Sequence, residues 1–133
     1  AGLQAGLKWI ARQGLAAIHE REIALTRKLR DGLRRIEGVT LYCQEDLADH
    51  ISVLAFNVDG LDSPNVATML DVDHNIASRA GLHCAPLVHE GLGTAGIDGA
   101  VRFGIGPFNT EAQIDTAVAA VAEIAAFQRR KRG

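Results

Sequence analysis

The sequence predicts an α+β domain: a small, mostly antiparallel sheet covered on one face by helices. The first observation behind this prediction is the order of patterns, because short segments rich in β-branched and aromatic residues have helical patterns before, between and after them. The second is the composition, since 133 residues that are 47% hydrophobic and 23% charged suit one globular domain with a modest core. Strands and helices in this order bury their apolar surfaces against one another in two layers.

The first third of the chain is predicted to be helical. Apolar residues follow helical spacing over residues 3–10, Gly14 interrupts the pattern, and the spacing resumes over residues 15–36. Gly38 stands where a helix would end. We therefore predict two consecutive helices before the first strand.

Two strands are predicted next. Residues 39–43 form a short strand, residues 44–50 (QEDLADH) form a polar loop, and residues 51–58 (ISVLAFNV) form a central strand. Asp59 and Gly60 end this second strand.

A helix and an extended segment follow. Ser63 before Pro64 predicts a helix start, with Ser63 as the cap and Pro64 as the first helical residue, and the helix runs to about His74. Residues 76–79 are predicted to be extended. A glycine-containing loop follows them, and its part over residues 85–99 is predicted to be flexible.

The last two elements are a strand and a helix. Residues 100–105 (AVRFGI) predict a strand. Asn109 and Thr110 mark the start of the final helix, in which Thr110 and Gln113 fit a capping box, and the helix continues to about Gln128.

The net charge of −2 provides no overall field that would attract nucleic acid or an anionic membrane. The strong charge run RRKR, residues 129–132, is interpreted as the solvated end of the last helix. No apolar run is long enough to cross a bilayer. Cys43 and Cys84 make no disulfide framework, so we expect free thiols in a reducing compartment, the cytoplasm. We expect no nucleic-acid and no membrane partner.

Cys84 lies in the stretch RAGLHCAPLVHEGLGT, residues 79–94, close to Arg79 and His83. A thiol reacts as the thiolate, which needs exposure and a nearby positive charge or base. A free cysteine is also often a small buried hydrophobe. The local sequence fits both readings of Cys84, whereas Cys43 ends an apolar strand and is interpreted as a packing residue.

Two other site classes are rejected on spacing and context. His83, Cys84 and His89 could be combined on paper with another ligand into a zinc site, but adjacent residues in an extended loop point in opposite directions and no C-x-x-C pair is present. We therefore expect no metal. The letters GLGTAG, residues 91–96, match G-x-G-x-x-G, but they lead into a strand instead of opening a helix. We therefore expect no dinucleotide there.

Arg102 lies within an apolar strand, between Val101 and Phe103. A buried arginine is costly unless it meets an anion or solvent, and a planar guanidinium suits bidentate binding of a carboxylate. An edge strand that turns Arg102 to water would explain the same pattern. Arg79 raises the same two alternatives.

Two separated motifs resemble one known family. Residues 79–85 read RAGLHCA, and residues 101–110 contain VR followed by FNT. The C-terminal parts of cysteine desulfurases and selenocysteine lyases, pyridoxal-phosphate enzymes of the class V aminotransferase fold, run R-x-G-H-H-C-A, then R-A-S or R-F-S, then Y-N-T. The leading helical segment is also similar to that family, so the resemblance covers essentially all 133 residues.

The resemblance implies a role for four residues. Cys84 matches the cysteine that attacks the substrate sulfur, which converts L-cysteine to L-alanine and leaves a persulfide on Cys84. Arg102 matches the arginine that holds the substrate carboxylate, and Arg79 matches a second substrate-placing arginine. His83 matches a histidine that lines the site. The implied partners are a small amino acid (cysteine or selenocysteine), a sulfur-acceptor protein near residues 85–99, and a second copy in a homodimer.

The resemblance also implies a place in a larger enzyme, as the small C-terminal domain of a fold-type I pyridoxal-phosphate transferase. The family's cofactor lysine belongs to a large domain, and Lys8, Lys28 and Lys131 stand in helical or tail positions. The chain also lacks a starting methionine. We expect residues 1–133 to form one domain with no cofactor-binding residue of its own and no activity alone, pyridoxal 5'-phosphate being held by the missing large domain.

Three departures from the family pattern keep alternatives open. Leu82 replaces the first histidine of H-H-C-A, Gly104 replaces a serine and Phe108 replaces a tyrosine. Leu82 removes a polar group beside the nucleophile, which leaves the choice between sulfur and selenium open. It also admits a class V aminotransferase-type enzyme that does not use Cys84. A non-enzymatic α+β binding domain with a buried Cys84 is the third alternative.

Overall fold

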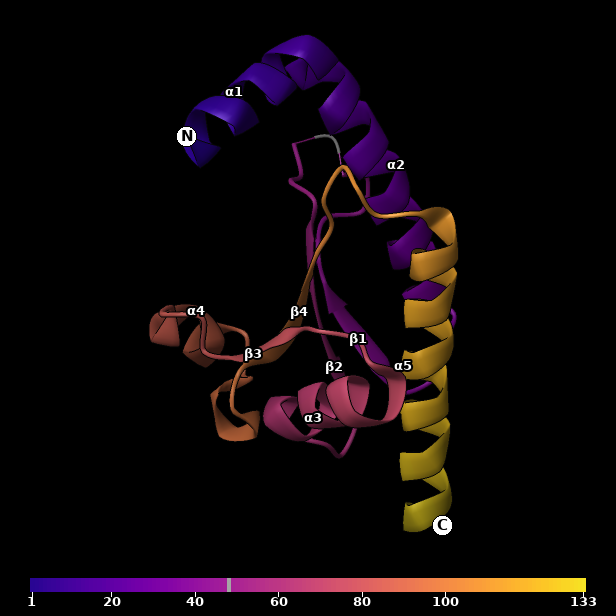
Figure 1. Cartoon of the computed structure of the whole chain (residues 1–133). Coiled ribbons are helices and arrows are strands. Elements are labelled where there is room, and N and C mark those ends of the chain that lie inside the picture. Colours follow the sequence, from indigo (N-terminus) through magenta and orange to yellow (C-terminus); the bar gives the residue numbers. More distant parts are fainter. Residues whose placement is uncertain (48) are drawn as a thin grey trace.

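The computed structural model describes residues 1–47 and 49–133, and Figure 1 shows its arrangement. The elements in order are α1 (Gly2–Gln13), α2 (Leu15–Arg34), β1 (Val39–Tyr42), β2 (Val53–Val58), α3 (Ser63–His74), β3 (Arg79–Gly81), α4 (Pro86–Gly91), the 3-10 turn η1 (Ala95–Ile97), β4 (Ala100–Gly104) and α5 (Glu111–Arg132). The four-stranded sheet has the order β1-β2-β4-β3, and every neighbouring pair is antiparallel. The predicted α+β class is confirmed.

The core lies on one face of the sheet. Strand side chains alternate between faces, so Leu54 and Phe56 of β2 and Val101 and Phe103 of β4 point the same way and are buried. The rings of Phe56 and Phe103 pack with centroids 5.1 Å apart. Val58, Ile105 and side chains of helices α2, α3 and α5 supply the rest of this cluster. Each large side chain that is fully buried there stabilises the fold by roughly 1.5–3 kcal/mol relative to exposure.

The opposite face of the sheet carries a row of side chains that the register defines. Tyr42 of β1 pairs with Ala55 of β2, Ala55 pairs with Arg102 of β4, and Arg102 pairs with Arg79 of β3. A one-residue slip of β4 would move Arg102 into the core and Phe103 out of it, so the apolar pattern fixes this register. Both arginines are thereby placed on the face away from the core helices.

The predicted break in the first helical segment is confirmed at Gly14, which has φ 83°. Positive φ is a conformation that glycine adopts without strain. Helix α1 has no buried residue and arches away from the sheet in Figure 1. Its Trp9 packs against Phe108, with ring centroids 4.9 Å apart.

The start of α3 differs from the prediction. Asp62, not Ser63, is the N-cap: its Oδ1 accepts a hydrogen bond of 2.9 Å from the Asn65 N–H. Ser63 is the first helical residue and is buried, with Pro64 after it. Aspartate caps as well as serine does, so the position one residue earlier could take over the role. Ser63 is thus left free for other contacts.

Several helix and strand boundaries differ by a few residues from those predicted. Strand β1 ends at Tyr42, β2 begins at Val53, β4 ends at Gly104, and α5 runs on to Arg132. The extended segment predicted over residues 76–79 meets strand β3 only at its last residue, since β3 begins at Arg79. The loop predicted over 44–50 is free of helix and strand wherever it is described, and residue 48 lies outside the described residues.

The stretch predicted as a flexible loop holds regular structure. It contains α4, which begins at Pro86, and the turn η1. Figure 1 shows α4 beside β3, away from α2 and α5. Proline at the first helical turn favours this start, because its missing N–H would be unpaired there anyway. The many glycines in this stretch favour a loop prediction, and α4 is too short to show helical periodicity in the sequence.

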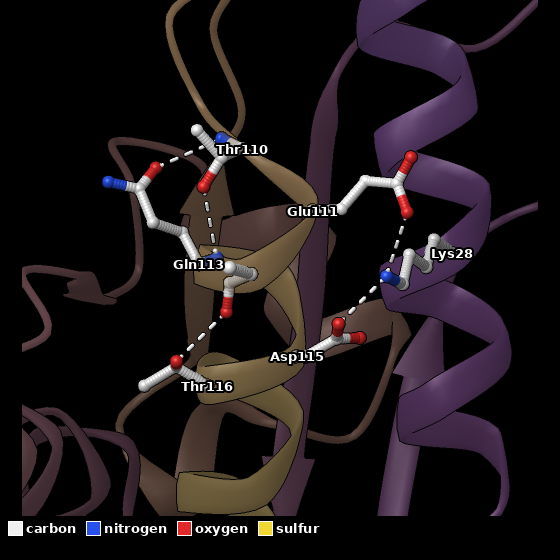
Figure 2. A network of polar contacts seen from close by, with 7 residues as sticks. Lys28, Thr110, Glu111, Gln113, Asp115 and Thr116 are labelled. Atoms are coloured by element: carbon white, nitrogen blue, oxygen red, sulfur yellow. Dashed lines mark hydrogen bonds and ion pairs between the residues drawn. The ribbon is translucent and has the colours of Figure 1, made fainter.

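Figure 2 shows the polar contacts at the start of α5. The predicted capping box is confirmed: Thr110 Oγ1 accepts from the Gln113 N–H at 3.3 Å, and Gln113 Oε1 accepts from the Thr110 N–H at 3.1 Å. Lys28 of α2 reaches across to Glu111 at 3.1 Å and Asp115 at 2.9 Å. Its hydrogen bonds to Asp115 and Glu111 raise the pKa of Lys28. These contacts tie the two core helices together at the surface.

Replacing Thr110 by alanine is expected to lower the free energy of unfolding by about 1 kcal/mol, because the substitution removes the side-chain half of the capping box. Urea unfolding of the two proteins measures the difference. Thr116→Ala is the matched control on the same helix, since it removes only a surface hydroxyl bond to the Ala112 carbonyl. We expect the control to change stability by less than about 0.5 kcal/mol. Equal losses in both variants would contradict a specific capping role.

Candidate active site

Arg79 and Arg102 stand directly opposite each other on β3 and β4. Directly opposite side chains in an antiparallel pair have Cβ atoms about 4.5–5.5 Å apart, and two like charges in this position destabilise the sheet. Within the described residues, neither guanidinium makes a hydrogen bond or an ion pair. Arg79 is exposed and Arg102 is half-buried. The planar fork of N–H donors on a guanidinium suits bidentate hydrogen bonds to a carboxylate or another planar anion.

His83 lies beside this arginine pair. Its Nε2 is 2.9 Å from the Ala100 carbonyl oxygen, so Nε2 carries the proton and donates, which leaves Nδ1 as an acceptor. Burial lowers the pKa of His83, and the charges of Arg102 and Arg79 lower it further, against the opposing effect of the Ala100 hydrogen bond. The imidazole is therefore neutral at pH 7. Strand β4 holds these three side chains near one another. Arg102 lies on β4, Arg79 pairs with it from β3, and His83 is hydrogen-bonded to Ala100 of β4.

Stability is expected to depend on pH through His83. Because the folded state lowers the pKa of His83, its unfolded state binds a proton more readily, and stability is lost as pH falls below about 6.5. Unfolding free energies measured between about pH 7.5 and 5 should decline more steeply for the natural chain than for His83→Gln, which cannot titrate. Parallel curves for the two proteins would show that His83 ionises alike in the folded and unfolded states.

Cys84 is exposed, which excludes the buried alternative. Its backbone has φ 59°, and that of His83 has φ 51°, so two consecutive non-glycine residues adopt the left-handed conformation. Each such residue costs on the order of 1–2 kcal/mol, and strain of this kind concentrates at functional sites. The strained turn places the Cys84 thiol at the surface immediately after His83. Exposure is one of the conditions that a reactive thiolate needs.

The residues that follow Cys84 in the sequence form a small packed unit. His89 and Thr94 are 5% and 2% exposed, and His89 Nδ1 lies 2.7 Å from Thr94 Oγ1. The rings of His83 and His89 lie side by side, with centroids 6.0 Å apart. The sequence offered no sign of this buried pair, because neither residue follows an apolar pattern. The segment that carries the thiol is internally held, in contrast to the flexible loop predicted.

The described part of the chain places neither a metal-binding cluster nor a lysine in the segment that carries Cys84. Residues 1–47 and 49–133 contain no group of three or more His, Cys, Asp or Glu side chains able to hold a metal ion. Lys28 is engaged by Glu111 and Asp115, while Lys8 and Lys131 lie on α1 and near the end of α5. No described lysine lies on β3, on β4 or on the segment between them. Enzymes bind pyridoxal phosphate covalently through a lysine. The described residues therefore place no lysine beside Cys84 that could form this linkage.

None of the helices in the described part of the chain has the length and apolar character needed to cross a membrane.

Comparison with known proteins identifies the relatives of this chain. The family model for class V aminotransferases matches residues 1–117. A probable cysteine desulfurase of Pyrococcus abyssi is 33% identical over 123 residues, which cover 92% of this chain and 29% of that protein. The cysteine desulfurase CsdA of Escherichia coli K12 is 33% identical over 122 residues, which cover 90% of this chain and 28% of CsdA.

Solved structures agree. The apo cysteine desulfurase of Thermococcus onnurineus superposes with a TM-score of 0.85 and 36% identity, over 94% of this chain and 30% of that one. The E. coli CsdA structure with an S-sulfonic acid gives a TM-score of 0.74 and 30% identity, over 92% of this chain and 29% of that one. The chain thus spans less than a third of the length of these relatives. With a family match over most of its residues and a shared fold, the chain belongs to the class V aminotransferase family, in which its relatives are cysteine desulfurases.

Proposed function

We propose that this chain is the small C-terminal domain of a cysteine desulfurase, which takes sulfur from L-cysteine onto Cys84. One observation carries the proposal: an exposed Cys84 thiol follows a neutral His83 that lies beside two arginines without partners among the described residues. A packing role would explain neither the exposure of the thiol nor the juxtaposition of Arg79 and Arg102. A site that binds a carboxylate and brings a thiol to it explains both.

Arg102 and Arg79 would hold the substrate. Arg102 lies on a central strand of the rigid sheet, so its guanidinium provides a fixed fork for the substrate carboxylate. Arg79 lies on the neighbouring edge strand and is more exposed, which suits a second contact to the same carboxylate. An anion bound between them would also remove the repulsion of the two like charges.

Cys84 would act as the nucleophile. Its thiolate forms a bond to the substrate sulfur while the bond between that sulfur and the substrate Cβ breaks, and the electron pair stays on the carbon side. After protonation the products are L-alanine and a Cys84 persulfide, so that cysteine plus thiol gives alanine plus persulfide without an added oxidant or reductant. The pyridoxal cofactor, when bound, supplies the electron sink that makes this bond breakable.

The chain spans less than a third of the length of its relatives, which supports a further part of the proposal. The cofactor and its lysine would belong to residues outside this chain, and the chain alone would not turn over. We further propose that the whole enzyme is a cytoplasmic homodimer and passes the persulfide sulfur to an acceptor protein that approaches α4. Selenocysteine is the second substrate that this chemistry admits.

The decisive experiment supplies L-cysteine to the enzyme that contains this chain and measures alanine release together with persulfide mapped to the Cys84 peptide by mass spectrometry. We expect both products, in equal amounts in the first turnover. Leu82 in place of a polar residue beside Cys84 favours a second candidate, a class V aminotransferase reaction that does not use the thiol. Keto-acid or pyruvate formation with no persulfide on Cys84 would support that candidate and overturn the desulfurase proposal.

A further inference from the structure

The segment that carries Cys84 leaves the sheet and returns to it at one point. We call residues 82–98 the Cys84 lobe. Its two ends are Gly81 of β3 and Gly99, which leads into β4, and Gly81 pairs with Ala100 in the sheet. Gly99 has φ 81°, and a Cβ atom on it would collide with the Gly81 carbonyl group. The two ends of the lobe therefore touch backbone to backbone.

One buried side chain joins the two sides of the base of the lobe. Ser63, at the start of α3, is 0% exposed. Its Oγ donates a hydrogen bond of 2.5 Å to the Asp98 carbonyl and accepts one of 3.1 Å from the Gly81 N–H. Gly81 directly precedes the lobe and Asp98 is its last residue, so a single hydroxyl bridges the base of the lobe. A buried hydroxyl with both its donor and acceptor functions used is a strong local constraint.

A second buried polar residue supports the same place. Asn57 of β2 is 4% exposed, and its Nδ2 donates to the Gly99 carbonyl at 3.0 Å and to the Tyr42 hydroxyl at 3.2 Å. The base of the lobe is thus held from α3 by Ser63 and from the sheet by Asn57. The lobe itself adds a hydrogen bond of 2.9 Å from the Gly99 N–H to the Thr94 carbonyl.

We propose that Ser63 is a positioning residue that keeps the base of the Cys84 lobe closed and so fixes the Cys84 thiol relative to Arg79 and Arg102. The effect on catalysis rests on the proposed desulfurase function, whereas the closure of the lobe does not. Cys84 lies three residues beyond Gly81, close enough that an opened base would displace the thiol directly. Because reacting atoms must be aligned, a displacement of about 1 Å can reduce a rate by roughly 100-fold.

Ser63 has no capping duty, because Asp62 caps α3. This separation supplies a matched control. Ser63→Ala removes the bridge and leaves the Asp98 carbonyl and the Gly81 N–H without their partner. Asp62→Ala loosens the start of the same helix and leaves the bridge in place. Ser63→Thr retains the hydroxyl and tests rescue.

The first measurement is hydrogen–deuterium exchange of peptides from the whole protein, followed by mass spectrometry. Ser63→Ala is expected to accelerate exchange across residues 82–98 by about tenfold, as the loss of buried hydrogen bonds favours local opening. Asp62→Ala should leave that segment unchanged, and Ser63→Thr should exchange as the natural protein does. Should Ser63→Ala not fold, Ser63→Cys, with its weak hydrogen bonding, is expected to show the same acceleration. Equal exchange in the Ser63 and Asp62 variants would overturn the closure.

The second measurement separates kcat from KM for L-cysteine in the whole enzyme. Ser63→Ala should lower kcat by roughly tenfold and leave KM within about twofold, because Arg102 on β4 still binds the carboxylate. A kcat equal to that of Asp62→Ala would overturn the positioning role even if exchange increased. Absence of persulfide in the natural enzyme would count against the proposed function alone, since the exchange result still decides whether Ser63 closes the lobe.

Discussion

Replacing Cys84 by alanine is expected to abolish persulfide formation, a loss of at least about 10³-fold in alanine release from L-cysteine. The side chain is exposed, so its truncation leaves no cavity in the core, and alanine meets the same backbone conformation as cysteine. No other described thiol is exposed: Cys43 is half-buried and packs against the core cluster. The measurement is alanine release together with persulfide mass on the Cys84 peptide.

Cys43→Ala is the matched control for this substitution. It removes the chain's other thiol and should retain the activity, with only the modest destabilisation of a partly buried site. Circular dichroism and thermal unfolding establish that both variants are folded. Undiminished persulfide in Cys84→Ala would rule out Cys84 as the nucleophile.

Replacing Arg102 by alanine is expected to raise KM for L-cysteine by roughly 30- to 150-fold. The substitution removes charge-assisted hydrogen bonds to the substrate carboxylate, together worth about 2–3 kcal/mol, and 1.4 kcal/mol corresponds to a factor of ten. Arg102 lies on the row shared with Arg79, on the face away from the core, so the core packing is retained. Steady-state kinetics with L-cysteine, in the enzyme that contains this chain, gives KM and kcat separately.

Two further variants decide whether a positive charge at position 102 is enough to bind the substrate carboxylate. Arg102→Lys keeps the positive charge and loses the planar fork, so KM should recover only part of the way. Arg34→Ala removes an exposed cation of α2 outside the candidate site and should leave KM unchanged. An unchanged KM in Arg102→Ala would mean that Arg102 is a surface residue of the strand with no contact to substrate.

The sequence was sufficient to predict elements whose signal is local. The break at Gly14, the central strand, the capping box of Thr110 and Gln113, and the α+β class all depend on spacing or on residue types a few positions apart. Serine before proline is a strong local pattern and predicts Ser63 as the cap of α3, but the neighbouring Asp62 competes for the same role and takes it. Helix α4 was missed because short helices depend on tertiary packing for their stability.

The candidate residues could be named from the sequence, but their arrangement could not be derived from local patterns. Arg79 and Arg102 are far apart along the chain, and they become neighbours only because β3 pairs with β4 at the edge of the sheet. The family resemblance implies no role for Ser63. The contacts of Ser63 are to backbone atoms of other segments, which the sequence does not reveal. Buried polar contacts of this kind have no periodicity by which they could be recognised.

The strand order also governs when the candidate site comes into being. Strand β3 pairs only with β4 in the described sheet, and β4 is the last strand in the sequence. A growing chain that ends before residue 100 therefore contains Arg79, His83 and Cys84 but offers β3 no edge to join. Long-range pairing of this type forms late, because the intervening chain must first be closed into a loop. Arg102 is thus brought beside Arg79, and to the segment that carries Cys84, only when β4 pairs with β3.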